Sequence, residues 1–560
     1  MKEVRYRIRV FAIIIALAVS GSIFLNYYQD DDTDFEVSKN LDIYYSLFKE
    51  LSIYYVDETD PGKLIKTSID EMLKSLDPYT VYIPESEMED FKFMTTGQYG
   101  GIGALIRKSG DYIVITDPYE NFPAFKGGLK AGDVIMAIDG KSIKGKKSDD
   151  VSELLKGQPN TEIKLTIKRP GTEDEFVKTL TREEIKLESV PYYSMLTPEI
   201  GYIRLRSFTQ NCGNDVKKAF LELKEKNDLK KLVLDLRGNP GGLLIEAVNI
   251  TNLFVEKGNE IVSTKGKVKQ WDKTYRASQE PIDTQMPIVV LVNRSSASAS
   301  EIVAGAIQDL DRGVIVGQRT FGKGLVQTTR PLSYNAKLKV TTAKYYIPSG
   351  RCIQALDYSH RNEDGSVGKV PDSLITEFKT KSGRKVFDGG GILPDVQMDA
   401  VKMSNIAYSL ASKNLIFDFA TEYVLKNKEI SDSKSFTLSD NDYDGFVKYL
   451  SGKEFDYKTE SESILKDLVK KAKDEKYYDL ATDEFTKLQE KLAHDKDKDL
   501  RTFKSEIIEL IDEEIAGRYF YQRGRIEAQI ENDPEIKKAV EVLGDMNNYY
   551  SLLKPSTEKK

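Results

Sequence analysis

The chain has 560 residues, of which 31% are charged, and its net charge is −7. A chain of this length folds into several domains, each large enough to bury a core of its own. Lysine and arginine are dispersed rather than gathered into a basic patch, which argues against nucleic acid as a partner.

Cysteine and histidine are both scarce, and this limits the chemistry that the chain can perform. Cys212 and Cys352 could form one disulfide in an oxidising compartment, but they are too few for a disulfide scaffold or a cysteine-rich zinc site. The two histidines, His360 and His494, lie in polar segments. A Ser/His/Asp hydrolase would need one of them, and a multi-histidine metal site is disfavoured. We therefore expect no metal, no cofactor and a base other than histidine for any serine chemistry.

The N-terminus has the pattern of an export segment. Basic residues precede an apolar run over residues 10–25, and acidic residues 30–32 follow it. This order is typical of a signal peptide, but the run also fits a marginal membrane anchor, and both alternatives stay open for residues 1–32. Either one predicts that the rest of the chain lies outside the cytoplasm, in the periplasm or tethered to the membrane.

Residues 35–96 form a predicted helical region. Apolar residues three and four apart predict an amphipathic helix over residues 40–56 and a second helix over residues 61–76, which Asp77-Pro78 ends. We expect both helices to be structural, with Ile65, Ile69, Met72 and Leu73 of the second helix facing inward.

Residues 97–185 change to an alternating, glycine-rich pattern that resembles a PDZ domain, most specifically over residues 128–140. In such domains a glycine-rich loop offers backbone amides to a C-terminal carboxylate, and the ligand adds as a strand to the sheet edge. The alternative is that the glycines of this loop only permit strands to pack closely. The resemblance assigns the peptide-binding role to Gly100, Gly101, Ile102 and Gly103.

An α/β pattern begins after residue 190. A buried strand predicted over residues 231–236 is followed by the turn Arg237-Gly-Asn-Pro-Gly-Gly242 and then by a helix. Glycines between a strand and a helix can direct backbone amides toward an anion, as an oxyanion site requires. The alternative is a tight turn that needs positive φ.

A second buried strand is predicted over residues 288–292, and serines follow it before the next helix. Unpaired amides and the helix dipole at such a junction favour negative charge, so a serine here is well placed as a nucleophile beside an oxyanion, and Ser295, Ser296, Ser298 and Ser300 are equal candidates. Ser298 and Glu301 also fit a capping box, in which both side chains only satisfy amides at the helix start. On this segment alone the cap is the better interpretation.

A glycine-rich segment from Gly317 to Gln327 fits most of a phosphate-binding P-loop. Gly324 stands where the magnesium-binding hydroxyl should be, and the residues after it predict a strand rather than a helix, so we reject nucleotide binding. Lys323 then remains as the candidate base for Ser298. Its pKa would have to fall by about three units, which burial among apolar neighbours can achieve, and Gln327 shares its strand parity and could orient it. The alternative is an ordinary surface lysine.

The rest of the chain completes the expected architecture. A polar stretch near residues 355–388 predicts an inserted loop or hairpin within a core that spans residues 190–402, and residues 403–560 predict helices. The fold class is multidomain α/β (α+β), with N-terminal helices, a PDZ-like β-rich domain, an α/β core and a C-terminal helical region.

Several segments, in this order, resemble the C-terminal processing (tail-specific) peptidases, which are serine endopeptidases with a Ser/Lys dyad and an embedded PDZ domain. The resemblance covers about residues 40–396. The insertion and the helices after Met403 depart from the family pattern, and neither touches the dyad. Besides the PDZ segment, the matching motifs are those at residues 76–85, 237–242, 296–301, 321–327, 346–351 and 391–395.

The resemblance implies a function as well as a fold. It implies an exported endopeptidase that captures the C-terminal tail of a protein substrate through its PDZ domain and hydrolyses a peptide bond near that tail. A further copy of the chain or an adaptor could bind through the helical regions. The competing interpretation is a non-catalytic PDZ scaffold on a protease-like fold. By position, the implied roles are nucleophile for Ser298, base for Lys323, orienting partner for Gln327, and oxyanion amides for Ala299, Gly241 and Gly242.

Overall fold

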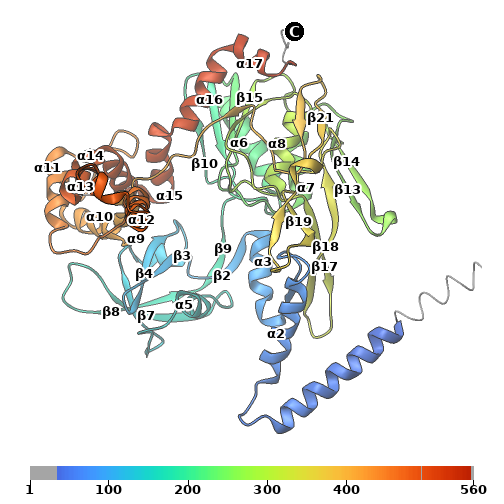
Figure 1. Ribbon diagram of the computed structural model, residues 1–560, viewed down its shortest axis with the longest axis horizontal. Helices are drawn as coiled ribbons and strands as arrows, with labels where there is room; N and C mark the ends of the chain where they lie inside the picture. Colours follow the sequence, from blue (N-terminus) through green and yellow to red (C-terminus); the bar gives the residue numbers. More distant parts are fainter. Residues whose placement is uncertain (1–33, 494, 556–560) are drawn as a thin grey trace, which may run out of the picture. The chain divides into compact units, whose positions relative to one another are not determined.

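The computed structural model describes residues 34–493 and 495–555 (Figure 1). The expected export segment or anchor, residues 1–32, lies outside these residues. In the described part of the chain, no helix has the length and apolar character needed to cross a membrane. The chain divides into two compact units, residues 1–82 and residues 83–560, which we describe separately.

The described part of the first unit is mostly helical, as predicted, but a short strand, β1 (Val81–Ile83), begins at its end. Residues 34–54 are helical, and α2 spans Pro61–Lys74 with Asp60 as its cap, whose carboxylate accepts a hydrogen bond from the Lys63 amide at 3.1 Å. Of the residues expected to face inward in α2, Leu73 is buried, but Met72 is 60% exposed, and Leu41 of the first helix is 62% exposed. Three-and-four spacing predicts an apolar face but does not supply a partner for it.

The PDZ-like segment forms an antiparallel sheet in the order β3-β4-β5-β7-β8, with β6 paired to β5, and β2 pairs separately with β9. Its apolar side chains alternate along the strands and form one core, which includes Ile113, Ile115, Ile135 and Ile163. The elements are α3 (Met88–Thr96), β2 (Gln98–Gly101), β3 (Ala104–Ser109), β4 (Tyr112–Pro118), α4 (Pro123–Lys126), β5 (Val134–Ile138), β6 (Lys141–Ser142), α5 (Ser148–Leu155), β7 (Glu162–Lys168), β8 (Phe176–Thr181) and β9 (Glu183–Lys186).

A six-stranded sheet forms the centre of the α/β core, in the order β10-β11-β12-β15-β16-β23. The strands β11 to β23 are parallel, so β12, β15 and β16 all end at one edge of the sheet, where α/β folds place their sites. The strands are β10 (Tyr192–Met195), β11 (Ile200–Arg204), β12 (Lys231–Asp235), β15 (Ile288–Val292), β16 (Val314–Gly317) and β23 (Val396–Gln397).

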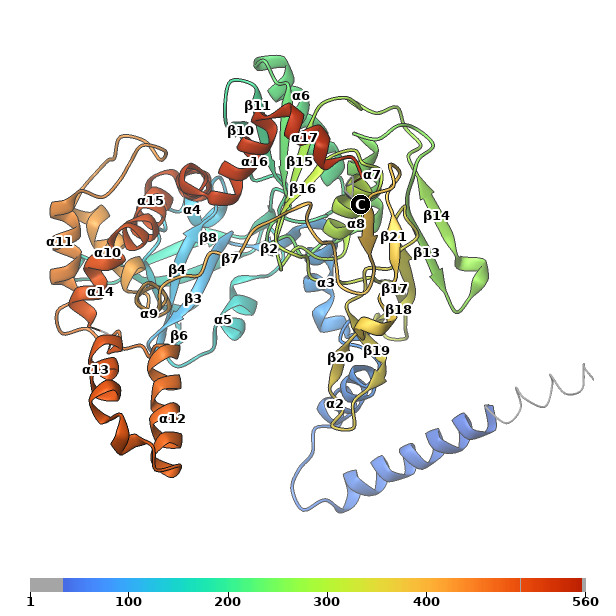
Figure 2. The same cartoon turned by 45° about the horizontal axis from the view of Figure 1, so that its top comes forward.

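Helices cover both faces of this sheet (Figures 1 and 2). Alternate residues of β15 point to opposite faces: Val290 packs with the helices α6, α7 and α8, whereas Val289 packs with α16 and α17. The C-terminal helices therefore belong to the same fold as the core. The helices are α6 (Cys212–Lys226), α7 (Leu244–Asn252), α8 (Ala299–Asp309), α16 (Pro534–Gly544) and α17 (Met546–Leu552).

A second sheet follows the core, and the predicted insertion forms two hairpins rather than one loop. In the second sheet, β18 pairs with both β13 and β17, and β13 also pairs with β14. The strands are β13 (Glu260–Gly266), β14 (Lys273–Arg276), β17 (Leu325–Pro331) and β18 (Lys337–Tyr346), and the hairpins are β19 (Leu356–Arg361) with β20 (Val367–Lys369) and β21 (Glu377–Lys379) with β22 (Lys385–Phe387).

The region after Met403 is helical, as predicted. Its longest helix, α15, is interrupted at Phe520 and Tyr521, where the backbone is not helical. Asp533 caps α16, because its carboxylate accepts hydrogen bonds from the amides of Glu535 and Ile536 at 2.8 and 3.0 Å. The helices before α16 are α9 (Asn405–Ser412), α10 (Leu415–Lys426), α11 (Asp440–Tyr449), α12 (Glu460–Asp474), α13 (Thr482–Leu492), α14 (Lys496–Thr502) and α15 (Lys504–Asn532).

The two cysteines do not form the disulfide that the sequence left open. Cys212 is buried in α6, Cys352 is partly buried, and both are free thiols. No cross-link therefore constrains the core through these residues.

Candidate active site

Ser298 lies at the junction of β15 and α8 in a backbone conformation that L-residues seldom adopt. Its φ is 56° and its ψ is −112°. The Ser298 amide donates to the Glu301 carboxylate at 2.8 Å, and the Tyr345 hydroxyl donates to the Ser298 carbonyl at 3.2 Å. Ser298 is the cap residue of α8, as the capping interpretation predicted, and its unusual conformation is held from two sides.

The neighbouring serines of this turn have structural roles that the sequence could not distinguish from that of Ser298. Ser296 and Ser300 are buried, and each hydroxyl donates to a backbone carbonyl of the turn after β12. The Ser296 hydroxyl bonds to the Leu236 carbonyl at 2.8 Å, and the Ser300 hydroxyl bonds to the Asn239 carbonyl at 2.9 Å. These bonds attach the Ser298 turn to residues 236–242.

Gly241 and Gly242 lie where the chain packs closely, Gly241 against Ser298 and Gly242 against Phe208. A Cβ atom on Gly241, whose φ is 101°, would lie 2.8 Å from the Ser298 Cβ and 2.9 Å from the Ala299 nitrogen. A Cβ atom on Gly242 would lie 2.4 Å from the Phe208 carbonyl oxygen. Both positions therefore need glycine for positive φ and for close packing.

The predicted oxyanion amides differ in their hydrogen bonds. The Gly241 amide already donates to the Asn239 side-chain oxygen at 2.9 Å. Within the described residues, no hydrogen bond uses the amides of Gly242 or Ala299. Of the three predicted amides, these two are therefore the ones left for a ligand.

Lys323 lies in the turn between β16 and β17, and this turn is attached to the same glutamate as Ser298. The Glu301 oxygen that accepts the Ser298 amide also accepts the Lys323 amide, at 2.9 Å. The two backbone nitrogens therefore cannot lie further apart than the sum of these two bonds. The Lys323 side chain is partly buried, and β17 begins at Leu325 as a strand, as predicted when the P-loop was rejected.

Glu301 is the residue whose importance the sequence did not reveal. Its carboxylate is fully buried and also accepts the Thr320 hydroxyl at 2.6 Å and the Gly322 amide at 2.7 Å. Burial raises the pKa of Glu301 to about 7, although the hydrogen bonds from Thr320, Lys323, Ser298 and Gly322 act to lower it. The capping box was visible in the sequence, but the two contacts with the Lys323 turn were not.

Gln327 lies in β17 beside a bulge in the pairing with β18. Val326 pairs with Ala343 and Gln327 with Thr341, so the extra residue is Thr342 of β18, and the alternation along β17 is not shifted. The Gln327 amide group donates to the Thr341 hydroxyl at 3.2 Å. The orienting role of Gln327 beside Lys323 stays a prediction.

The histidines offer no alternative base in the described side chains. The His360 side chain is 86% exposed and contacts the Asp357 carboxylate at 2.8 Å, three residues away. The side chain of His494 lies outside the described part. His360 is thus a surface residue of the inserted hairpin.

A groove of about 300 Å³ lies between β3 and α5 of the PDZ-like segment. Gly100 and Gly101 precede it, in β2, and a Cβ on Gly100 would lie 2.1 Å from the Gly157 carbonyl oxygen, as the close-packing alternative predicted. The amides of Ile102 and Gly103 make no hydrogen bond with the described residues. Residues that line the groove include Ile102, Leu105, Ile106, Ser148, Ser152 and Leu155.

The chain combines a parallel-sheet core, a serine at a strand–helix turn and a groove between β3 and α5 of the PDZ-like segment. These features together define a protease that carries a PDZ domain. Residues 199–360 match peptidase family S41, residues 114–169 match the PDZ domain, and residues 406–543 match the probable PDZ-protease, C-terminal helical domain.

Known proteins agree with this class. A carboxy-terminal-processing protease of Bartonella bacilliformis is 40% identical over 342 residues, 60% of this chain and 76% of the relative. A probable CtpA-like serine protease of Staphylococcus aureus strain N315 is 36% identical over 394 residues, 69% of this chain and 76% of the relative. The solved photosystem II D1 C-terminal processing protease is 30% identical, with 63% of this chain and 86% of that chain covered and a TM-score of 0.35. The chain belongs to the carboxy-terminal-processing proteases of peptidase family S41.

Proposed function

We propose that the protein is an exported serine endopeptidase in which Ser298 is the nucleophile and Lys323 the general base. The observation that carries the proposal is the shared Glu301 oxygen, which holds the backbones of both residues at 2.8 and 2.9 Å. Catalytic groups must be held within a fraction of an ångström, and one buried acceptor common to both turns provides such a constraint.

The reaction follows from these positions. The Ser298 hydroxyl oxygen bonds to the carbonyl carbon of the substrate while the neutral Lys323 amine takes the hydroxyl proton. The amides of Ala299 and Gly242 donate to the oxyanion that forms. When the carbon–nitrogen bond breaks, the Lys323 ammonium returns the proton to the leaving amine. Water then attacks the acyl-enzyme ester, with Lys323 again as base, and restores the Ser298 hydroxyl.

Capture of the substrate is assigned to the PDZ groove. An extended C-terminal tail adds beside β3, and its carboxylate accepts hydrogen bonds from the amides of Ile102 and Gly103. Of the four predicted residues, Gly100 and Gly101 then serve to bring β2 close to its neighbours. Export to the periplasm, or a tether through residues 10–25, remains part of the proposal because of the basic and apolar pattern of the N-terminus.

The proposal is tested by cleavage of an unfolded reporter protein. We expect Ser298→Ala and Lys323→Ala each to lower kcat by about 1,000-fold or more. Ser295→Ala is a matched control, because Ser295 is an exposed serine of the same turn, and we expect it to cleave within twofold of wild type. Equal turnover by Ser298→Ala and wild type would refute the dyad, and no turnover by any form would favour the scaffold.

Tail capture has its own test. Amidation of the reporter's C-terminus removes the charge that the Ile102 and Gly103 amides would accept, so we expect KM to rise about tenfold with little change in kcat. An unchanged KM would contradict carboxylate recognition.

A further inference from the structure

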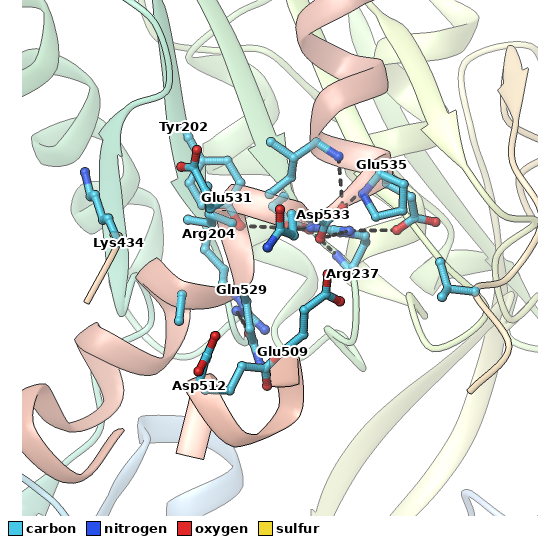
Figure 3. Close-up of a pocket in the computed structure, with 18 of the residues that line it drawn as sticks. Tyr202, Arg204, Arg237, Lys434, Glu509, Asp512, Gln529, Glu531, Asp533 and Glu535 are labelled. Carbon is cyan, nitrogen blue, oxygen red and sulfur yellow. Dashed lines mark hydrogen bonds and ion pairs between the residues drawn. The ribbon is translucent and has the colours of Figure 1, made fainter. Parts of the chain in front are cut away.

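The N-terminus of α16 lies at the catalytic edge of the core sheet. Arg237, in the turn that carries Gly241 and Gly242, donates from one terminal nitrogen to both Asp533 and Glu535, each at 2.7 Å (Figure 3). Its other nitrogens donate to Asp235, the last residue of β12. One arginine thus links the end of a catalytic strand to the start of a C-terminal helix.

Glu535 also reaches the turn that carries Lys323. Its second carboxylate oxygen accepts the Gln318 side-chain amide at 3.1 Å. Gln318 is the first residue after β16, and its backbone amide donates to the Val292 carbonyl at 3.0 Å. A single carboxylate therefore contacts both the turn of residues 236–242 and the turn of residues 318–323.

These ion pairs are well shielded from water, so they hold the Arg237 side chain in one position. The side chains of Arg237 and Glu535 are 15% and 9% exposed, and Asp235 is almost completely buried. In such surroundings a guanidinium that loses one carboxylate keeps its charge and must move toward another partner. A shift of Arg237 would displace the turn that faces Ser298.

The helix that presents Glu535 is itself rigidly held. Ile536, Ala539 and Val542 of α16 pack on the second face of the sheet. The Tyr549 hydroxyl of α17 bonds to both the amide and the carbonyl of Ile288, at 3.0 and 3.1 Å. The apolar face of α16 thus stays in place when only the polar residues at its start are changed.

From this arrangement we propose that Glu535, with Asp533, is a positioning residue of the protease: the C-terminal helix α16 sets the distance between the Gly242 amide and the Lys323 turn. This role rests on the proposed function of Ser298 and Lys323. It gives the C-terminal helical region a task in catalysis, in addition to covering the sheet.

The test compares Glu535→Gln and Asp533→Asn with a matched control, Glu531→Gln. Asparagine caps helices as well as aspartate does, so Asp533→Asn keeps the start of α16 while it removes one charge from Arg237. Glu531 lines a cavity of about 580 Å³ that Asp533 and Glu535 also line, is exposed, and forms no ion pair within the described residues (Figure 3).

For Glu535→Gln we expect kcat on the unfolded reporter to fall about 10-fold to 100-fold with KM within twofold, because displaced catalytic groups slow chemistry rather than capture. Asp533→Asn should lower kcat less, and Glu531→Gln should stay within twofold of wild type. The rate at which a fluorophosphonate labels Ser298 should fall in parallel with kcat. Binding of a tail peptide, measured by fluorescence anisotropy in a Ser298→Ala background, should not change.

The outcomes separate the two proposals. Wild-type kcat in both Glu535→Gln and Asp533→Asn, beside an inactive Ser298→Ala, would overturn the positioning role alone. The positioning role would also be overturned if the melting temperature fell so far that unfolding of the variant at the assay temperature explained the whole loss of kcat. Wild-type cleavage by Ser298→Ala would instead refute the nucleophile assignment.

Discussion

Two sets of polar contacts hold the turns around Ser298, Lys323 and Gly242, and they differ in chemistry: one is built on the carboxylate of Glu301 and the other on the guanidinium of Arg237. Glu301 accepts four hydrogen bonds, from Ser298, Thr320, Gly322 and Lys323, and none of these donors is a charged group. Around Arg237, by contrast, one guanidinium binds the carboxylates of three acidic residues, Asp235, Asp533 and Glu535.

The difference decides how each set responds to pH. Burial raises the pKa of Glu301 to about 7, since no cation offsets the cost of its charge. Burial also acts to raise the pKa of Asp235, but Arg237 outweighs it and lowers the pKa. Glu301, whose donors are all uncharged (the neutral link), can therefore titrate near neutral pH. Asp235, which is paired with Arg237 (the ion-paired link), stays charged there.

Removing the neutral link should have the largest effect. Glu301→Ala leaves three amides and a hydroxyl without an acceptor and releases Ser298 from the Lys323 turn, each unpaired group costing about 1–3 kcal/mol. We expect kcat/KM to fall by at least about 1,000-fold, together with a lower melting temperature. The measurements are reporter cleavage and calorimetry, with Glu531→Ala as the control. Activity within tenfold of wild type would show that the shared anchor is dispensable.

Breaking the ion-paired link should cost stability at every pH near neutrality. Asp235→Asn leaves the buried Arg237 short of a partner, and such a break costs about 3–5 kcal/mol. Because the pKa of Asp235 is lowered, its contribution is present above its ordinary value and is lost only as pH falls through the lowered value. Urea unfolding at pH 5 and pH 8 should give the same loss. A loss that appears only at pH 8 would contradict the assignment.

The neutral link should show the opposite pH dependence. The pKa of Glu301 in the folded protein, about 7, lies above its ordinary value of 4.5, so its contribution to stability is complete below pH 4.5 and is lost as pH rises through 7. Relative to Glu301→Gln, wild type should lose about 3 kcal/mol of unfolding free energy between these limits. The measurement is urea unfolding of both proteins from pH 4 to pH 8, and a constant difference would argue against this titration.

The sequence predicted the parts of the site that depend on local patterns. Apolar runs predicted the strands that end at Asp235 and Val292, and the small residues after them predicted the turns. Both predictions succeed because a buried strand needs apolar residues and a tight turn needs small ones within a few positions of each other. The cap at Ser298 and the strand after Lys323 were predicted for the same reason.

The long-range contacts could not be predicted. Glu301 and Glu535 resemble other acidic residues of a chain that has 89 of them, and only folding brings Glu535 to Arg237, 298 positions earlier in the chain. The bulge at Thr342, opposite Val326 and Gln327, has no signal in the sequence either. For residues 34–54, periodicity gave the helix but not whether its apolar face is covered.

The most direct test of the central claim is the site and rate of covalent labelling by a fluorophosphonate, which reacts only with an activated serine. Peptide mass spectrometry should find the label on Ser298 in wild type, and Lys323→Ala should lower the labelling rate by about 1,000-fold while the protein stays folded. A label on another serine, or an equal labelling rate in Lys323→Ala, would contradict the Ser298/Lys323 mechanism.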